Sequence, residues 1–162
     1  MAAREPGQGD WDWVRTPAAF LTALADGPMP RYVFFLNWSI IVPPAITERY
    51  ECVNFHCTAL PFGRGGHPIE NLILRGVAET VITAYRMTST VDAGPIYGVS
   101  PAVSLAGSKA QICARFVQPC AALIRWMVTT EPRPTPQRGE VIPFRRLSAE
   151  AYARVWQARV PT

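Results

Sequence analysis

Three polar side chains in this chain of 162 residues have types that together can act on a carbonyl group: Asn54, His56 and Asp92. An amide N–H and an imidazole can hold an oxygen on which negative charge develops, and a carboxylate can accept a proton and orient the imidazole. Spacing alone favours a structural role, because strand-end Asn and His side chains most often cap neighbouring backbone, and an Asp before Ala-Gly usually forms a turn. A catalytic role therefore needs support from the surrounding elements.

The segments around these residues have the pattern of an α/β sheet. Residues 32–36 and 52–56 are short apolar runs rich in β-branched and aromatic residues, which is typical of strands covered on both faces. The second run carries Asn54 and His56 at its carboxyl end, where sheets of this class keep their sites. Further strands are predicted over residues 80–87, 96–99 and, more weakly, 141–144.

Helices are predicted from prolines and cap residues at their starts and from apolar spacing along their lengths. They cover residues 11–25, 44–50, 68–74, 105–128 and 148–157. The elements together predict an α/β fold with a mixed, mainly parallel sheet flanked by helices. We expect an N-terminal helical extension over residues 1–30, a core over 31–130, and a linker with a short helix over 131–162.

The composition limits the classes of partner and compartment. Apolar residues make up 49% of the chain and charged residues 17%, with a net charge of +4 that is not gathered in a block, so we expect no nucleic-acid partner. The apolar stretch over residues 32–46 is too short and too interrupted to span a membrane. Four cysteines form no Cys-x-x-Cys pair and the N-terminus lacks the regions of a signal peptide, which indicates a cytoplasmic protein.

A loop over residues 60–68 contains three glycines, whose φ freedom permits close backbone approach to a ligand. Within it, Arg64, Gly65 and His67 are candidates for contact with substrate. The Arg64 guanidinium can hold a carboxylate or phosphate, or equally brace its own loop through carbonyl groups. The residue types leave both roles open.

Two longer stretches around the three polar residues resemble the formyltransferase family that uses formyltetrahydrofolate. Residues 53–66 read VNFHCTALPFGRGG, and residues 91–97 read VDAGPIY. Family members have Asn-x-His-Pro-Ser-Leu-Leu-Pro, then Arg-Gly and a helix, and about thirty residues later Asp-x-Gly and a strand. Two long motifs in the same order and at the same separation are far more specific than one short pattern. The resemblance covers about residues 30 to 130.

The resemblance implies a Rossmann-like core and roles for individual residues. The family's catalytic Asn, His and Asp match Asn54, His56 and Asp92, which would stabilise the oxyanion and relay the proton of an attacking amine. The co-substrate would be 10-formyltetrahydrofolate, with no metal. Its pterin would lie between the segment 36–41 and the loop 88–92, where the candidate cofactor-binding residues are Leu36, Asn37, Trp38, Ile40, Ile41, Thr90, Val91 and Asp92.

The sequence also departs from the family pattern. Only about thirty residues precede the strand over residues 32–36, where members have a further strand-helix-strand-helix unit, so the core is shortened and we expect the acceptor half to be missing or replaced. The edge left open by a missing unit predicts a homodimer or a partner protein covering it. The tRNA enzyme's carboxyl-terminal barrel has no counterpart, which argues against initiator tRNA as substrate.

Two other kinds of site are less consistent with the sequence. A zinc site from Cys52, His56, Cys57 and His67 matches no common ligand spacing, and strand alternation sends neighbouring side chains to opposite faces. The same alternation separates the Cys57 thiol from the His56 imidazole, which argues against a cysteine nucleophile.

The expected function is transfer of a formyl group from 10-formyltetrahydrofolate to a small-molecule amine, an amino sugar or the amine of a natural product. Hydrolysis of formyltetrahydrofolate needs the same three residues and stays an alternative. A remnant that binds folate without catalysis, or serves as a subunit of a larger assembly, is the alternative from another class.

Overall fold

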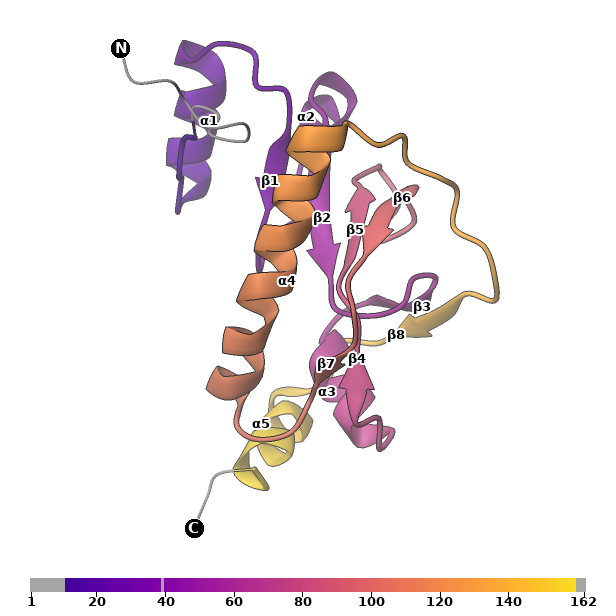
Figure 1. Cartoon of the computed structure of the whole chain (residues 1–162). Coiled ribbons are helices and arrows are strands. Elements are labelled where there is room, and N and C mark those ends of the chain that lie inside the picture. Colours follow the sequence, from indigo (N-terminus) through magenta and orange to yellow (C-terminus); the bar gives the residue numbers. More distant parts are fainter. Residues whose placement is uncertain (1–10, 39, 160–162) are drawn as a thin grey trace.

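The central sheet has four strands in the order β1-β2-β5-β6 in the computed structural model, which describes residues 11–38 and 40–159. The long helix α4 (Lys109–Thr130) crosses one face of this sheet, and α1 (Pro17–Asp26) lies beside the β1 edge (Figure 1). The four strands are β1 (Val33–Phe35), β2 (Cys52–His56), β5 (Thr83–Arg86) and β6 (Ile96–Val99).

Both directions of strand pairing occur. Strand β1 pairs with β2 in parallel, whereas β2 with β5 and β5 with β6 are antiparallel. Two small sheets add a parallel pair, β3 (Phe62–Gly65) with β8 (Ile142–Phe144), and an antiparallel pair, β4 (Glu79–Thr80) with β7 (Val103–Ser104). The predicted mixed α/β fold is confirmed. Its parallel share is smaller than expected, because β5 pairs with β2 in the antiparallel direction and leaves β1–β2 as the parallel pair of the central sheet.

Helix boundaries follow their caps. The Thr16 hydroxyl accepts a hydrogen bond from the Ala19 N–H at 3.2 Å, so α1 begins at Pro17 rather than at residue 11. Ser108 and Gln111 form a reciprocal capping box, which starts α4 four residues after the predicted position. The remaining helices are α2 (Pro44–Arg49), α3 (Pro68–Leu74) and α5 (Ala149–Gln157).

The strand predicted over residues 80–87 is two strands in the structure. The Thr80 hydroxyl donates to the Cys57 carbonyl (2.8 Å), and the Ile82 N–H donates to the Ser100 hydroxyl (2.9 Å). The Ser100 hydroxyl thus takes the Ile82 N–H at the bend, where the chain leaves the β4–β7 pair and enters the central sheet as β5. In the part predicted as a glycine loop, β3 forms because it pairs with β8.

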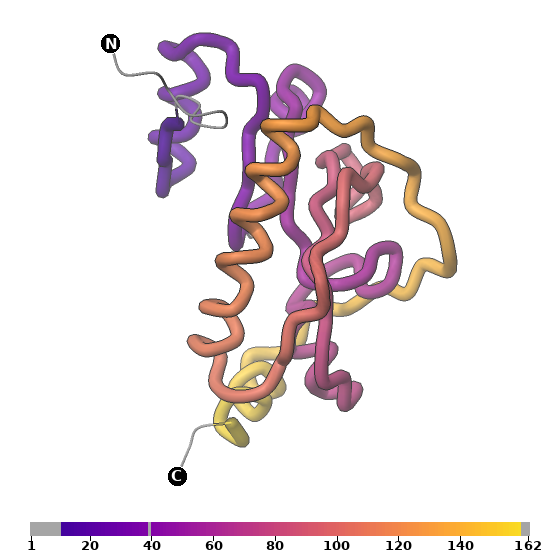
Figure 2. The backbone as a smooth tube through the Cα atoms, viewed as in Figure 1, coloured from indigo at the N-terminus to yellow at the C-terminus, as the bar shows by residue number. Residues whose placement is uncertain are grey.

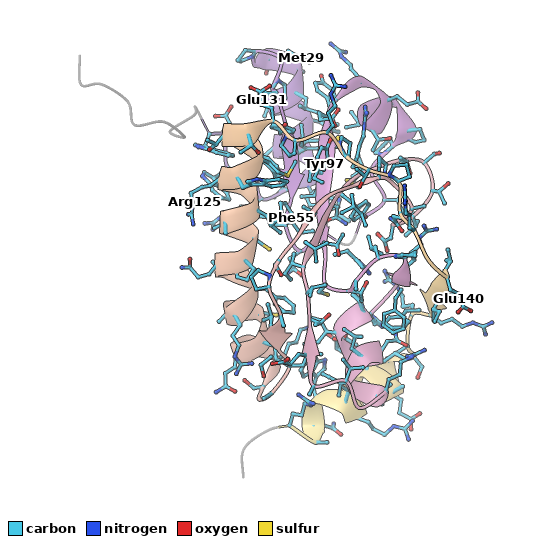
Figure 3. The ribbon with its side chains drawn as sticks, turned by 45° about the vertical axis from the view of Figure 1, so that its right-hand side comes forward. Met29, Phe55, Tyr97, Arg125, Glu131 and Glu140 are labelled. Atoms are coloured by element: carbon cyan, nitrogen blue, oxygen red, sulfur yellow. The ribbon has the colours of Figure 1, made fainter. Side chains whose placement is uncertain are left out.

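Alternation along β2 divides its side chains between the two faces of the sheet. Val53 and Phe55 pack with the apolar side chains of α4, and Figure 3 shows Phe55 and Tyr97 on that side. Asn54 and His56 therefore belong to the opposite face. The candidate site lies on the face of the sheet that α4 does not cover.

The segment after α4 returns along the sheet before it reaches β8 (Figure 2). Ile96 and Thr135 exchange two backbone hydrogen bonds, of 2.7 and 2.8 Å, which hold this segment beside β6. The segment after α4 thus runs along the β6 edge of the central sheet, toward the loop that carries Asp92. None of the helices in the described ranges is long and apolar enough to cross a membrane.

Candidate active site

Strand β2 places Asn54 and His56 opposite Tyr85 and Thr83 of β5, respectively. His56 is 6% exposed, and its Nε2 lies 2.7 Å from the Gly63 carbonyl oxygen. Because a carbonyl oxygen only accepts, Nε2 carries the hydrogen of this bond. The other ring nitrogen, Nδ1, is 3.7 Å from Asp92 Oδ2, which is too long for a direct hydrogen bond.

Asp92 lies in the loop between β5 and β6 with a left-handed backbone (φ +51°), a conformation that Asp tolerates better than most residues. Its carboxylate is buried and accepts two hydrogen bonds. The Tyr85 hydroxyl donates to Oδ1 at 2.5 Å, and the Gly65 N–H donates to Oδ2 at 2.8 Å. An ionised carboxylate has about four lone-pair positions, so Oδ2 retains the capacity to accept a further proton.

The structure thus brings Asn54, His56 and Asp92 together, and it adds Tyr85, which the sequence interpretation missed. Asn54 Nδ2 donates to the Tyr85 hydroxyl oxygen at 3.0 Å. Burial raises the pKa of Tyr85 far above its usual value, and the nearby Asp92 charge raises it further, so the phenol keeps its proton. In the sequence, Tyr85 is marked only by its position in a predicted strand shortly before Asp92. This position indicates a place in the site only when β5 is known to pair with β2.

Gln137 also belongs to the site, and nothing in its proline-rich surroundings pointed to it. Its Nε2 donates to the carbonyl oxygens of Asp92 (2.9 Å) and Gly94 (2.8 Å). Its Oε1 accepts from Arg64 Nε (3.0 Å) and Nη2 (2.7 Å). Arg64 therefore braces the loop through a side-chain amide, rather than through the carbonyl groups considered from the sequence.

The other two loop candidates differ in position. Gly65 touches the site directly through its N–H, whereas His67 faces away from it. His67 Nδ1 accepts from the Leu147 N–H (3.0 Å), and its ring packs on Tyr152 at 4.8 Å between centroids. His67 thus holds the C-terminal segment.

The predicted pterin-binding segments expose apolar side chains. The exposed fractions are 38% for Leu36, 54% for Ile40, 81% for Ile41 and 58% for Val91. Such a group of exposed aliphatic residues suits contact with a flat, partly apolar ring. Thr90, in the second segment, is tied into its loop through its carbonyl, which accepts from the Thr88 hydroxyl at 3.1 Å.

Trp38 and Asn37 occupy the turn after β1. Trp38 packs edge-on against Phe20 and Phe35, with ring centroids 6.3 and 5.5 Å apart, and Met87 joins the same cluster. Its indole Nε1 is buried without a hydrogen-bond partner in the described part of the chain. Asn37 has a left-handed backbone (φ +52°) that turns the segment. An unpaired donor beside exposed aliphatic groups fits a ligand that has both a ring face and acceptor atoms.

The cysteines do not form a reactive centre. Burial raises the pKa of the Cys57 thiol to about 12, so Cys57 stays neutral near pH 7. All four cysteines are free thiols. Within residues 11–38 and 40–159, no group of three or more His, Cys, Asp or Glu side chains is arranged to hold a metal ion.

The fold and the site define an α/β protein that brings an amide, an imidazole and a carboxylate to the face of the sheet that α4 does not cover. The curated relatives include methionyl-tRNA formyltransferases. That of Methylococcus capsulatus is 39% identical over 71 residues, which span 43% of this chain and 23% of the relative. That of Sorangium cellulosum is 31% identical over 155 residues, which span 89% of this chain and 48% of the relative. No family model matches the sequence.

Solved structures agree with the curated relatives. Methionyl-tRNA formyltransferase from Clostridium thermocellum superimposes with a TM-score of 0.72 and 38% identity, over 75% of this chain and 53% of that one. The formyltransferase PseJ from Anoxybacillus kamchatkensis shares the fold at a TM-score of 0.60 and 19% identity, over 82% of this chain and 70% of that one. The chain belongs to the formyltransferase family, and it spans about half the length of the Sorangium relative.

Proposed function

We propose that this protein transfers the formyl group of 10-formyltetrahydrofolate to a small-molecule amine, such as an amino sugar or the amine of a natural product. The observation that carries the proposal is the convergence of Asn54, His56 and Asp92 on one face of the sheet in a member of the formyltransferase family. The reaction forms a C–N bond to the amine, breaks the C–N bond to the folate, and moves one proton from the amine to the folate nitrogen.

The co-substrate supplies an activated formyl carbon. Leu36, Ile40, Ile41 and Val91 would cover its ring face, and Trp38 Nε1 offers an unpaired donor nearby. Solved structures of the relatives PseJ and HypX, the latter from Aquifex aeolicus, contain tetrahydrofolate or tetrahydrofolic acid, which supports a folate as co-substrate here.

Each of the three polar side chains has a different role in the proposed reaction. Asn54 Nδ2 has two hydrogens, of which one is given to Tyr85, so the second is free to bind the formyl oxygen as it gains negative charge. His56 lies beside it and, with Nε2 held by Gly63, turns Nδ1 toward Asp92. Asp92 Oδ2 then serves as the group that accepts the amine proton, directly or through water.

A small acceptor agrees with the charge of the chain. Its net charge of +4 is spread along the sequence and is not gathered in a block of basic residues of the kind that favours tRNA binding. The structure of PseJ contains a UDP-linked formamido sugar, which supports an amino sugar as the class of acceptor.

Calorimetric titration is the first test. We expect saturable, micromolar binding of a stable formyltetrahydrofolate isomer and of tetrahydrofolate, weakened when Trp38 is changed to Ala. Turnover is then followed as tetrahydrofolate release in the presence of a panel of amino sugars. Absence of folate binding to the folded protein would contradict the proposal and favour a non-catalytic role as a subunit of a larger assembly.

Substitutions test whether Asn54 and Asp92 are needed for turnover. Asn54→Ala and Asp92→Ala should lower turnover by about 10²- to 10³-fold, because each removes a group that meets developing charge. Asp26→Ala is the matched control, since Asp26 is exposed at the end of α1, away from the site, and its loss should leave turnover unchanged. Equal turnover in all variants would remove the proposed site, and tetrahydrofolate release without any amine would indicate hydrolysis instead.

A further inference from the structure

Tyr85 connects two of the proposed catalytic groups through a single hydroxyl. Asn54 Nδ2 lies 3.0 Å from this hydroxyl on one side, and Asp92 Oδ1 lies 2.5 Å from it on the other. Tyr85 is 2% exposed and stands directly opposite Asn54 in the β2–β5 register. The bridge is therefore a fixed, buried feature of the sheet rather than a surface contact.

The direction of the two hydrogen bonds follows from proton counting. An ionised carboxylate only accepts, so the single Tyr85 proton must go to Asp92. The Tyr85 oxygen then has only lone pairs left for Asn54, which must present its NH₂ group and not its carbonyl oxygen. The Asn54 amide, whose two orientations would otherwise fill the same space, thus has one permitted orientation.

We infer that Tyr85 is a positioning residue that sets the orientation of the Asn54 amide according to the charge on Asp92. This inference rests on the proposed function for its catalytic meaning, because only the NH₂ orientation places a donor at the site for an oxyanion. The hydrogen bonds that run from Asn54 through Tyr85 to Asp92, called the relay below, are a property of the folded chain. They exist whether or not the protein catalyses a reaction.

The relay predicts a specific reversal in Asp92→Asn. The Gly65 N–H, which now donates to Asp92 Oδ2 at 2.8 Å, requires an acceptor at that position and so fixes the new amide with its oxygen toward Gly65. The NH₂ of residue 92 then faces Tyr85 and donates to it. Tyr85 must pass its own proton to Asn54, whose amide turns by 180° to accept it with Oδ1.

The test reads the Asn54 side-chain amide by NMR on isotope-labelled full-length protein, with its signals assigned by their loss in Asn54→Ala. In the wild type, we expect a contact from the Asn54 NH₂ to the Tyr85 ring and slow exchange of one amide hydrogen with water. In Asp92→Asn this contact should vanish while the fold is kept. In Tyr85→Phe, which removes only the hydroxyl, the slow exchange should be lost.

Kinetics give a second readout. Tyr85→Phe should lower kcat by about 10- to 100-fold with little change in KM for the folate, since a misplaced donor affects the transition state more than binding. Tyr97→Phe is the matched control, because Tyr97 is buried on the neighbouring strand with its hydroxyl bonded to Glu51, outside the site. Its kcat should stay within about twofold of the wild type.

The outcomes separate the relay from the proposed function. Unchanged Asn54 amide signals in both Tyr85→Phe and Asp92→Asn would overturn the relay, even if the enzyme is active. The expected NMR changes in a wild type that transfers no formyl group would leave the relay standing and overturn the function. A loss of kcat in Tyr97→Phe equal to that in Tyr85→Phe would contradict a positioning role.

Discussion

Gln137 holds Asp92 by its backbone, donating from Nε2 to the Asp92 carbonyl oxygen at 2.9 Å across 45 residues of sequence. Because the same nitrogen also binds the Gly94 carbonyl (2.8 Å), the turn that gives Asp92 its positive φ is held from outside the β5–β6 connection. The carboxylate that faces His56 thus depends on a side chain from the C-terminal segment.

Gln137→Ala should therefore weaken both stability and turnover. Loss of the four hydrogen bonds that the Gln137 side chain makes with Asp92, Gly94 and Arg64 is expected to cost about 1–3 kcal/mol of unfolding free energy, measured by urea denaturation. Turnover should fall by about 10- to 100-fold, because a small displacement of Asp92 moves its carboxylate from the site. Gln118→Ala, on the exposed side of α4, should change neither quantity; an equal effect there would refute the argument.

Elements with strong local signals could be predicted from the sequence. Strands β2 (Cys52–His56) and β6 (Ile96–Val99) and helix α3 (Pro68–Leu74) have the predicted bounds, because apolar runs or an opening proline define each one. Strands β3 and β8 depend on each other: Phe62–Gly65 contains two glycines, and only its parallel pairing with Ile142–Phe144 makes it a strand. A pairing between segments so far apart leaves no periodic pattern in either one.

The site shows the same division. Asn54, His56 and Asp92 are marked in the sequence by motifs, and the structure shows that they converge, while their catalytic roles stay predictions. Tyr85 and Gln137 join the site only through their positions in the folded chain. A tyrosine in a strand normally indicates packing, and a glutamine in a proline-rich segment indicates exposure, so neither residue type reveals a hydrogen bond to Asp92.

Gly65→Ala tests the close approach of β3 to β8. A methyl group at Gly65 would lie 2.3 Å from the Phe144 carbonyl oxygen, and the backbone there has φ +113°. We expect a loss of about 2–4 kcal/mol in unfolding free energy, together with reduced turnover, because the Gly65 N–H would move away from Asp92. Gly76→Ala is the control: its φ of +71° is also positive, but nothing lies within 4 Å of the added methyl, so it should cost only about 1–2 kcal/mol. Equal costs would show that the Phe144 contact does not matter.

Thiol labelling tests the conclusion that Cys57 is not a nucleophile. With a pKa of about 12, about one Cys57 side chain in ten thousand is a thiolate at pH 8, whereas Cys113 is exposed on α4. Iodoacetamide should therefore modify Cys113 well before Cys57, as read by peptide mass spectrometry. Cys57→Ala should retain turnover within about threefold. Rapid labelling of Cys57, blocked by folate, would contradict this assignment.

Alkaline pH should destabilise the fold through one buried thiol, Cys52, and two half-buried thiols, Cys57 and Cys120. Burial raises the pKa of Cys52 and Cys120 to about 11 and of Cys57 to about 12, from a usual value of 9.0. Above pH 9 the unfolded chain loses these protons while the folded chain keeps them, so unfolding free energy falls as pH rises, by up to about 1.4 kcal/mol per pH unit for each thiol. The stabilisation is complete below pH 9 and is lost as pH rises toward 11 and 12.

Urea denaturation between about pH 8 and pH 10.5 measures this slope. It should be smaller in Cys57→Ala and in Cys120→Ala than in the wild type, because each variant removes one group that titrates on unfolding. Cys113→Ala is the control, since an exposed thiol meets a similar environment in both states and its removal should leave the slope unchanged. If all three variants kept the wild-type slope, the alkaline sensitivity would have to come from groups other than the buried thiols.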